Sequence, residues 1–184
     1  MRYVGVFCGS SEGSRPEYVA AAQALGRTLA HRRVGLVYGG SSVGTMGRLA
    51  DAVLESGGEV IGVIPKALID RELAHQGLSD LRKVSTMHER KALMEQLSDG
   101  FVALPGGLGT LDEFFEILSW AQLGFHGKPC GLLNVCGYYD KLIDFLEHAV
   151  AQRFVKERNR QLIMVARHPD PLLQRMGLRA VAAD

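Results

Sequence analysis

The chain has 184 residues, 47% of them hydrophobic, and this size and composition suit one domain with a substantial core. Its 21 Lys and Arg residues nearly balance its 20 Asp and Glu residues, which argues against a nucleic-acid-binding protein, because such a protein needs a basic surface to displace counterions. No apolar run is long enough to span a bilayer, and the N-terminal "MRYVGVFCGSS" lacks the pattern of a signal peptide. We therefore predict a single domain over residues 1–184 with no nucleic-acid or membrane partner.

Predicted strands and helices alternate along the whole chain. In the first half, short apolar runs predict strands over residues 3–8, 34–40, 59–65 and 81–86, and helical spacing predicts helices over residues 16–32, 45–56 and 87–97. In the second half, strands are predicted over residues 100–107, 129–135 and 161–166, with helices over residues 111–123 and 138–152. A terminal helix is predicted to begin at Asp170-Pro171, with the Asp as its cap and the Pro at its first position.

The predicted strands are continuous apolar runs rather than alternating ones. Such runs are typical of a parallel sheet that is covered by helices on both faces. The fold class predicted from this pattern is α/β, a Rossmann-like, doubly wound parallel sheet. In such sheets ligands bind outside the carboxyl ends of the strands, so we expect a site among the loops at that edge.

Three glycine-rich loops follow strands at that edge: "CGSSEGS", "YGGSSVGTMG" and "LPGGLGT". Each joins a strand to a helix, so its backbone amides could bind an anion beside the helix N-terminus. For any one loop an ordinary turn is the better interpretation, but three together favour a phosphate or nucleotide site. The first loop lacks the dinucleotide-binding G-x-G-x-x-G, and the second has Thr45 where a P-loop requires lysine. We therefore expect neither an ordinary NAD site nor P-loop ATP hydrolysis.

The stretch "STMHERKALMEQL" carries two cations in an unusual place. Thr86 and Glu89 can form a capping box at a helix start, which puts Arg90 and Lys91 near the N-terminus, where the helix dipole disfavours positive charge. Arg90 also shares a helix face with apolar residues three and seven positions further on. A basic pair on a surface helix is the ordinary interpretation. The two unfavourable placements favour instead a pair that faces an anion.

Glu113 has two competing interpretations. Thr110 and Glu113 in "TLDE" match a capping box, and spacing alone favours that structural role. The predicted helix over residues 111–123 is, however, apolar nearly all round and should be largely buried. A carboxylate inside it needs a partner, which ligand hydroxyls or Arg90 could supply. The same apolar surface predicts at least a dimer, because too many of its faces are apolar for the outer layer of a monomer.

The sequence resembles the LOG (Lonely Guy) family. "PGGLGTLDE" matches the family motif P-G-G-x-G-T-x-x-E, "MHERK" matches M-H-x-R-K, and the similarity covers almost the whole chain. Members are cytokinin riboside 5′-monophosphate phosphoribohydrolases, long mislabelled as lysine decarboxylases, and bacterial members that resemble this chain commonly accept AMP. The resemblance implies an N-glycosidase that hydrolyses a nucleoside 5′-monophosphate to free base and ribose 5-phosphate. It also implies a homodimer or a hexamer built from dimers.

The resemblance also implies roles for individual residues. Arg90 and Lys91 match the substrate-contacting pair of the family, and Glu113 matches its essential carboxylate, so Arg90 and Glu113 are the expected catalytic residues. Glu72 resembles an acidic residue that contacts substrate. The phosphate-binding turn of the family is matched by Gly106, Gly107, Gly109 and Thr110.

The chemistry of such a reaction agrees with these residue types. Breaking a ribose C1′–N bond builds positive charge on the sugar, which a carboxylate can stabilise, while the phosphate needs an anion-binding turn. No metal or other cofactor is expected, and no pyridoxal-phosphate lysine site is recognisable. The alternative function is a non-catalytic, Rossmann-like nucleotide-binding or carrier module. Cys8, Cys130 and Cys136 lack metal-type spacing and are interpreted as reduced thiols of a cytoplasmic protein.

Overall fold

A single parallel sheet organises the fold. The computed structural model describes residues 1–72, 74–78 and 80–178, and for residues 70–72 it describes the backbone alone. Within these ranges, seven parallel strands pair in the order β4-β3-β2-β1-β5-β6-β7. The strands are β1 (Tyr3–Phe7), β2 (Gly35–Tyr38), β3 (Val60–Pro65), β4 (Asp80–Val84), β5 (Gly100–Ala103), β6 (Cys130–Leu133) and β7 (Ile163–Ala166). The predicted doubly wound α/β fold is confirmed.

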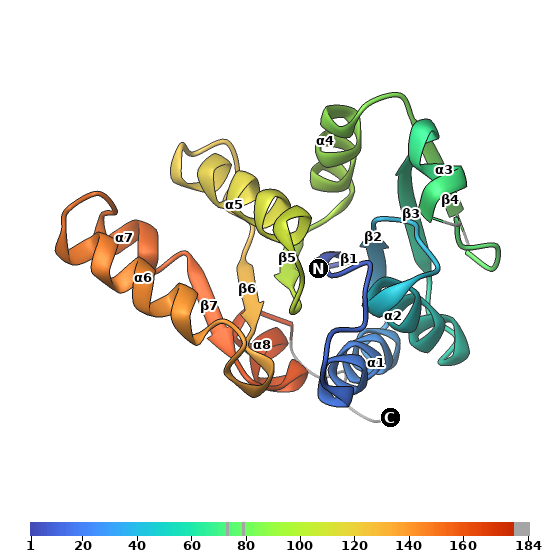
Figure 1. Ribbon diagram of the computed structural model, residues 1–184, viewed down its shortest axis with the longest axis horizontal. Helices are drawn as coiled ribbons and strands as arrows, with labels where there is room; N and C mark the ends of the chain where they lie inside the picture. Colours follow the sequence, from blue (N-terminus) through green and yellow to red (C-terminus); the bar gives the residue numbers. More distant parts are fainter. Residues whose placement is uncertain (73, 79, 179–184) are drawn as a thin grey trace.

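Helices cover both faces of the sheet (Figure 1). One face carries α1 (Pro16–His31), α2 (Gly44–Glu55) and α8 (Pro169–Arg175). The other carries α4 (Met87–Leu97), α5 (Leu108–Gln122) and α6 (Asp140–Ala151). The shorter helices are α3 (Lys66–Glu72), the 3-10 turn η1 (Val135–Gly137) and α7 (Glu157–Arg160). Among the described residues, no helix is long and apolar enough to cross a membrane.

Alternate residues of the inner strands fill one of two cores. Val4 and Val6 belong to the cluster under α1, α2 and α8. Phe7 and Phe101 belong to the opposite cluster, where their rings stack with centroids 5.8 Å apart. Because both faces of the inner strands are buried, nearly all of their positions favour apolar residues, which explains the continuous runs in the sequence. The edge strand β4 is only partly buried.

The order of the strands places a crevice between β1 and β5. From β1 the chain moves outward to β4 and then returns to pair β5 with the free edge of β1. The loops after β1 and β5 therefore leave the sheet in different directions, which is the usual ligand position in an open parallel sheet. Figure 1 shows α4 and α5 on the same side of this point.

Several predicted boundaries are wrong. Helices α3, η1 and α7 were not expected from the sequence. Strand β5 ends at Ala103, although the buried Leu104 and Pro105 prolong the apolar run beyond it. Helix α8 begins at Pro169 after His168, which gives no side-chain cap, so Asp170 lies inside the helix rather than capping it.

Candidate active site

A cavity of about 230 Å³ lies at the carboxyl ends of the central strands. It brings together residues that the sequence places far apart, from the β1–α1 loop, the end of β2, α4 and the first turns of α5. Those lining it are Val6, Cys8, Gly9, Ser10, Gly39, Met46, Arg90, Gly107, Leu108, Gly109, Thr110 and Glu113. Both residues predicted to be catalytic and three of the four predicted turn residues are therefore in one cavity.

Arg90 reaches this cavity from the start of α4. The Thr86 cap is confirmed, since the Glu89 amide donates to Thr86 Oγ1 at 3.1 Å. The Glu89 carboxylate accepts from the Ser85 amide at 2.7 Å, one residue before the N-cap, rather than from the Thr86 amide of a capping box. The arginine side chain that follows is buried, with Nε donating to the Val63 carbonyl at 3.1 Å and Nη2 to the Gly39 carbonyl at 3.4 Å. The surface interpretation of Arg90 is therefore wrong.

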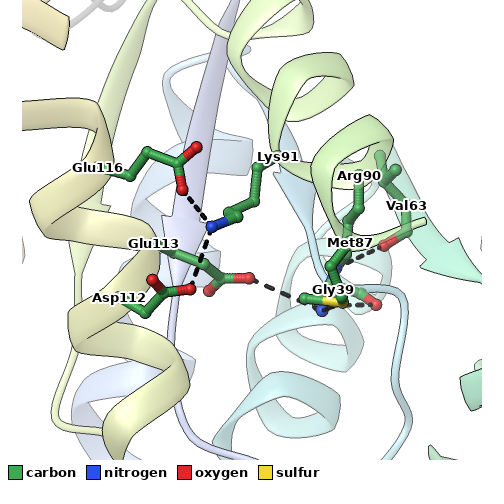
Figure 2. A network of polar contacts seen from close by, with 8 residues as sticks. All are labelled: Gly39, Val63, Met87, Arg90, Lys91, Asp112, Glu113 and Glu116. Atoms are coloured by element: carbon green, nitrogen blue, oxygen red, sulfur yellow. Dashed lines mark hydrogen bonds and ion pairs between the residues drawn. The ribbon is translucent and has the colours of Figure 1, made fainter.

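Glu113 faces Arg90 from α5. Its Oε1 lies 3.7 Å from Arg90 Nη1, and only 8% of the residue is exposed (Figure 2). The helix already begins at Leu108 behind the N-cap Gly107, so Glu113 lies in the second turn. The capping box predicted for Thr110 and Glu113 is therefore wrong, and with it the expectation that Thr110 caps the helix.

The N-terminus of α5 opens into the same cavity. Gly107 is its N-cap and makes no side-chain cap, so the first amides of the helix lack an intrahelical partner. A Cβ added to Gly107 or Gly109 would meet no atom within 4 Å, so these two positions border open space. Gly106 differs, because a Cβ there would lie 2.1 Å from Thr110 Oγ1. The arrangement suits an anion held by backbone amides and by the helix dipole.

The N-terminus of α2 is closed to such a ligand. The Gly9 carbonyl accepts from the Met46 amide at 3.3 Å, and the Ser11 carbonyl accepts from the Thr45 amide at 3.4 Å. Thr45 Oγ1 also accepts from the Gly9 amide at 3.1 Å and donates to the Gly9 carbonyl at 3.0 Å. Thus the second glycine-rich loop holds the first one in place. Thr45 therefore supports the loop that lines the cavity, a role that its position in the sequence did not reveal.

Lys91 points away from the cavity. Its Nζ lies 3.2 Å from an Asp112 carboxylate oxygen and also contacts Glu116, both on α5 (Figure 2). Only 12% of the lysine side chain is exposed. Burial alone would lower the pKa of Lys91, but the contacts with Glu116 and Asp112 outweigh it and raise that pKa above its ordinary value. Among the described residues, those that line the cavity with Arg90 and Glu113 do not include Lys91.

Cys8 and Glu72 are the other two residues to be placed relative to the cavity. Burial raises the pKa of the Cys8 thiol to about 12, which keeps this cavity residue a neutral thiol at pH 7. Glu72 was predicted to contact substrate, and its side chain lies outside the described residues.

Comparisons with known proteins identify the family. The family model described as "Possible lysine decarboxylase" matches residues 46–176. The chain is 49% identical to a probable cytokinin riboside 5′-monophosphate phosphoribohydrolase of Oryza sativa subsp. japonica, over 95% of this chain and 70% of the relative. It is 47% identical to a cytokinin riboside 5′-monophosphate phosphoribohydrolase of Arabidopsis thaliana, over 95% of this chain and 81% of the relative.

A solved structure shares the fold. The molybdenum cofactor binding protein from the phototrophic bacterium Rippkaea orientalis aligns with a TM-score of 0.66 and 23% identity, over 92% of this chain and 91% of that chain. At this identity the likeness concerns the fold alone. The family model and the two plant relatives cover most of the chain, including α4 and α5. The chain belongs to the family of cytokinin riboside 5′-monophosphate phosphoribohydrolases, the LOG family.

Proposed function

We propose that this protein hydrolyses the N-glycosidic bond of nucleoside 5′-monophosphates and releases the free base and ribose 5-phosphate. The observation that carries the proposal is the buried Glu113 carboxylate, 3.7 Å from Arg90, in a cavity that also contains the open N-terminus of α5. An anion-binding helix end beside a buried carboxylate fits a phosphorylated sugar. The names of the relatives support the same activity.

The amides at Gly107, Gly109 and Thr110 would hold the 5′-phosphate, with Gly106 giving Thr110 the space to pack. The ribose would then lie toward Glu113. As the C1′–N bond breaks, its electron pair leaves with the base, which takes up a proton, and positive charge develops on the sugar. Glu113 would stabilise that charge or take the proton of the water whose oxygen bonds to C1′. Arg90 would keep Glu113 ionised, because an adjacent cation favours the charged carboxylate.

AMP and cytokinin riboside 5′-monophosphates are the proposed substrates. The test is incubation of the purified protein with AMP, isopentenyladenosine 5′-monophosphate and adenosine, followed by quantification of free base and ribose 5-phosphate. We expect both nucleotides to be cleaved and adenosine to be cleaved far more slowly. Binding of both nucleotides without release of base would overturn the enzymatic proposal and favour the nucleotide-binding or carrier module.

A homodimer or a higher homo-oligomer is the proposed assembly. The prediction that α5 is largely buried holds for Phe114, Ile117 and Leu118, but Leu108 and Leu123 at its ends are 87% and 64% exposed. Phe125, just beyond the helix, is 75% exposed. A second copy that covers these side chains would remove apolar surface from water. A monomeric mass by light scattering at micromolar concentration would contradict this proposal.

The cytoplasm is the proposed compartment. The cysteines Cys8, Cys130 and Cys136 are all free, with the first two buried. Unpaired thiols are typical of a reducing compartment. Location of a fluorescent fusion, followed by fractionation of the cells, would test this assignment.

A further inference from the structure

We propose that Lys91 is a positioning residue that balances the charge around Glu113 and does not contact the substrate. This inference rests on the proposed function and deepens it, because it separates the two cations of the "MHERK" motif into different roles. Arg90 enters the cavity, whereas Lys91 joins α4 to α5 behind it.

The amine of Lys91 is already paired within the protein. Its amine is held by Asp112 at 3.2 Å and by Glu116, so two carboxylates of α5 already share one cation. A phosphate that needed this amine would have to displace both, although the α5 N-terminus offers it amides without such competition. The resemblance to the family had assigned Lys91 to the substrate, and this geometry assigns it to the protein.

Glu113 has two other carboxylates close to it on the same helix. Helix α5 places Asp112, Glu113 and Glu116 within five positions, and Glu113 and Glu116 are three residues apart on neighbouring turns. Lys91, Glu113 and Glu116 also border one gap with Phe7 and Ile117 that is too narrow for a water molecule. Only 12% of the Lys91 side chain and 23% of the Glu116 side chain are exposed, so water screens the charges of Lys91, Glu113 and Glu116 poorly. The Asp112 side chain is 61% exposed, so water screens its charge well.

Helices α4 and α5 supply the charged groups around Glu113, and the end of β1 supplies a neutral one. Helix α4 contributes the cations Arg90 and Lys91, α5 contributes the anions Asp112 and Glu116, and β1 is followed by the neutral thiol of Cys8. Removing the positive charge of Lys91 would leave the largely buried Glu116 uncompensated beside Glu113, while the exposed Asp112 would contribute less. Since like charges disfavour ionisation, Glu113 would then keep its proton to a higher pH.

The experiment follows the ionisation of Glu113 directly. The carboxyl ¹³C resonance of Glu113 is titrated by NMR in the wild type, in Lys91→Met, and in the double variant Lys91→Met/Glu116→Gln. We expect Lys91→Met to raise the midpoint by about one pH unit, the size of shift that a close uncompensated charge produces. The double variant removes one positive and one negative charge, so its midpoint should return toward that of the wild type.

Turnover supplies the second readout. For AMP, kcat is measured as a function of pH. The acid limb of this profile should move to higher pH in Lys91→Met and return toward its wild-type position in the double variant, while Lys91→Arg should behave like the wild type. The ratio of kcat/KM for AMP to that for adenosine should stay unchanged in Lys91→Met. The matched control is Lys141→Met, which removes an exposed lysine of α6 and should change neither the midpoint nor the profile.

The outcomes test the role of Lys91 separately from the proposed function. An unshifted Glu113 midpoint in Lys91→Met, or a rise in KM for AMP alone that Glu116→Gln does not reverse, would overturn the positioning role. A shifted and restored midpoint in a protein that cleaves no nucleotide would support the role of Lys91 and overturn only the proposed function.

Discussion

The guanidinium of Arg90 occupies the space that a side chain at position 39 would fill. A Cβ added to Gly39 would lie 2.1 Å from Arg90 Nη2 and 3.0 Å from Met46 Sδ. The Gly39 carbonyl also accepts a hydrogen bond from Arg90 Nη2 at 3.4 Å. The end of β2 thus lacks a side chain at the point where a cation from α4 enters the cavity.

Gly39→Ala should therefore displace the Arg90 guanidinium. Because the obstructing atom is the end of a long side chain, we expect the fold to persist while turnover falls by about tenfold or more, as for a misplaced electrostatic group. The measurement is kcat on AMP beside thermal melting. Gly127→Ala is the control, since a Cβ at Gly127 would meet no atom within 4 Å. Unchanged turnover in Gly39→Ala would show that the position of Arg90 does not matter.

The fold was predictable because its signal is repeated in the inner strands and in the long helices. Burial on both faces makes the inner strands apolar runs, and helices separate the runs along the chain, whereas the edge strand β4 (DLRKV) is only partly buried and carries three charged residues. Short elements gave no such signal: the helix Glu157–Arg160 buries none of its residues, so no apolar periodicity marks it. Helix starts were also misjudged, since Gly107 takes the N-cap position where a polar cap was expected at Thr110.

The charged residues of the site could be predicted from the sequence, but the residues that hold them in position could not. Arg90 and Glu113 stood out because a charge within an apolar pattern needs a partner. The double hydrogen bond of Thr45 to Gly9 and the space that Gly39 leaves for Arg90 depend on distant segments meeting. The spacing of residues along the sequence does not show which distant segments lie together in the fold. The separate roles of Arg90 and Lys91 became visible only from the directions of their side chains.

Gly109→Ala should separate stability from activity. The residue lies in the first turn of α5, and a Cβ there would meet no protein atom within 4 Å. Alanine is a better helix former than glycine by roughly 0.5–1 kcal/mol, so the melting temperature should hold or rise. The added methyl would occupy space beside the phosphate, so kcat/KM for AMP should fall while that for adenosine changes little. An equal loss on both substrates would place the phosphate elsewhere.

Stability should decline at alkaline pH. Burial raises the pKa of the Cys8 and Cys130 thiols from 9.0 to about 12, and it raises the pKa of Tyr38 and Tyr139 as well. Between about pH 9 and 12 the unfolded chain therefore releases protons that the folded chain keeps, and unfolding becomes easier as pH rises.

Denaturant midpoints measured across this pH range would check the decline. Cys130→Ala should flatten the pH dependence because one buried thiol no longer titrates on unfolding. Cys136→Ala is the matched control, since the Cys136 thiol is exposed, and it should leave the slope unchanged. The slopes are compared rather than the absolute stabilities, because removing a buried side chain also lowers stability at every pH. A stability that is constant from pH 9 to pH 12 would contradict the prediction.

Arg90 and Glu113 should be coupled in stability and both required for turnover. Their side chains are 7% and 10% exposed and 3.7 Å apart, so Arg90→Met would remove a cation that lies beside a buried carboxylate. Such a loss costs about 3–5 kcal/mol. Glu113→Gln should cost less, because Arg90 keeps its hydrogen bonds to the Val63 and Gly39 carbonyls. The double variant removes both charges and should be more stable than the sum of the single effects, by about 1 kcal/mol or more.

Turnover should not recover in the double variant, unlike stability. A neutral amide at position 113 cannot stabilise a ribosyl cation or accept a proton from water, so Glu113→Gln should lose roughly two orders of magnitude in kcat, and the double variant at least as much. Nucleotide binding by Glu113→Gln should persist, because the amides of the α5 N-terminus are untouched. Chemical denaturation, calorimetric binding of AMP and turnover would be measured on all four proteins. Near-normal turnover in Glu113→Gln would mean that the carboxylate serves only to pair with Arg90, and the chemistry would then have to lie with another group in the cavity.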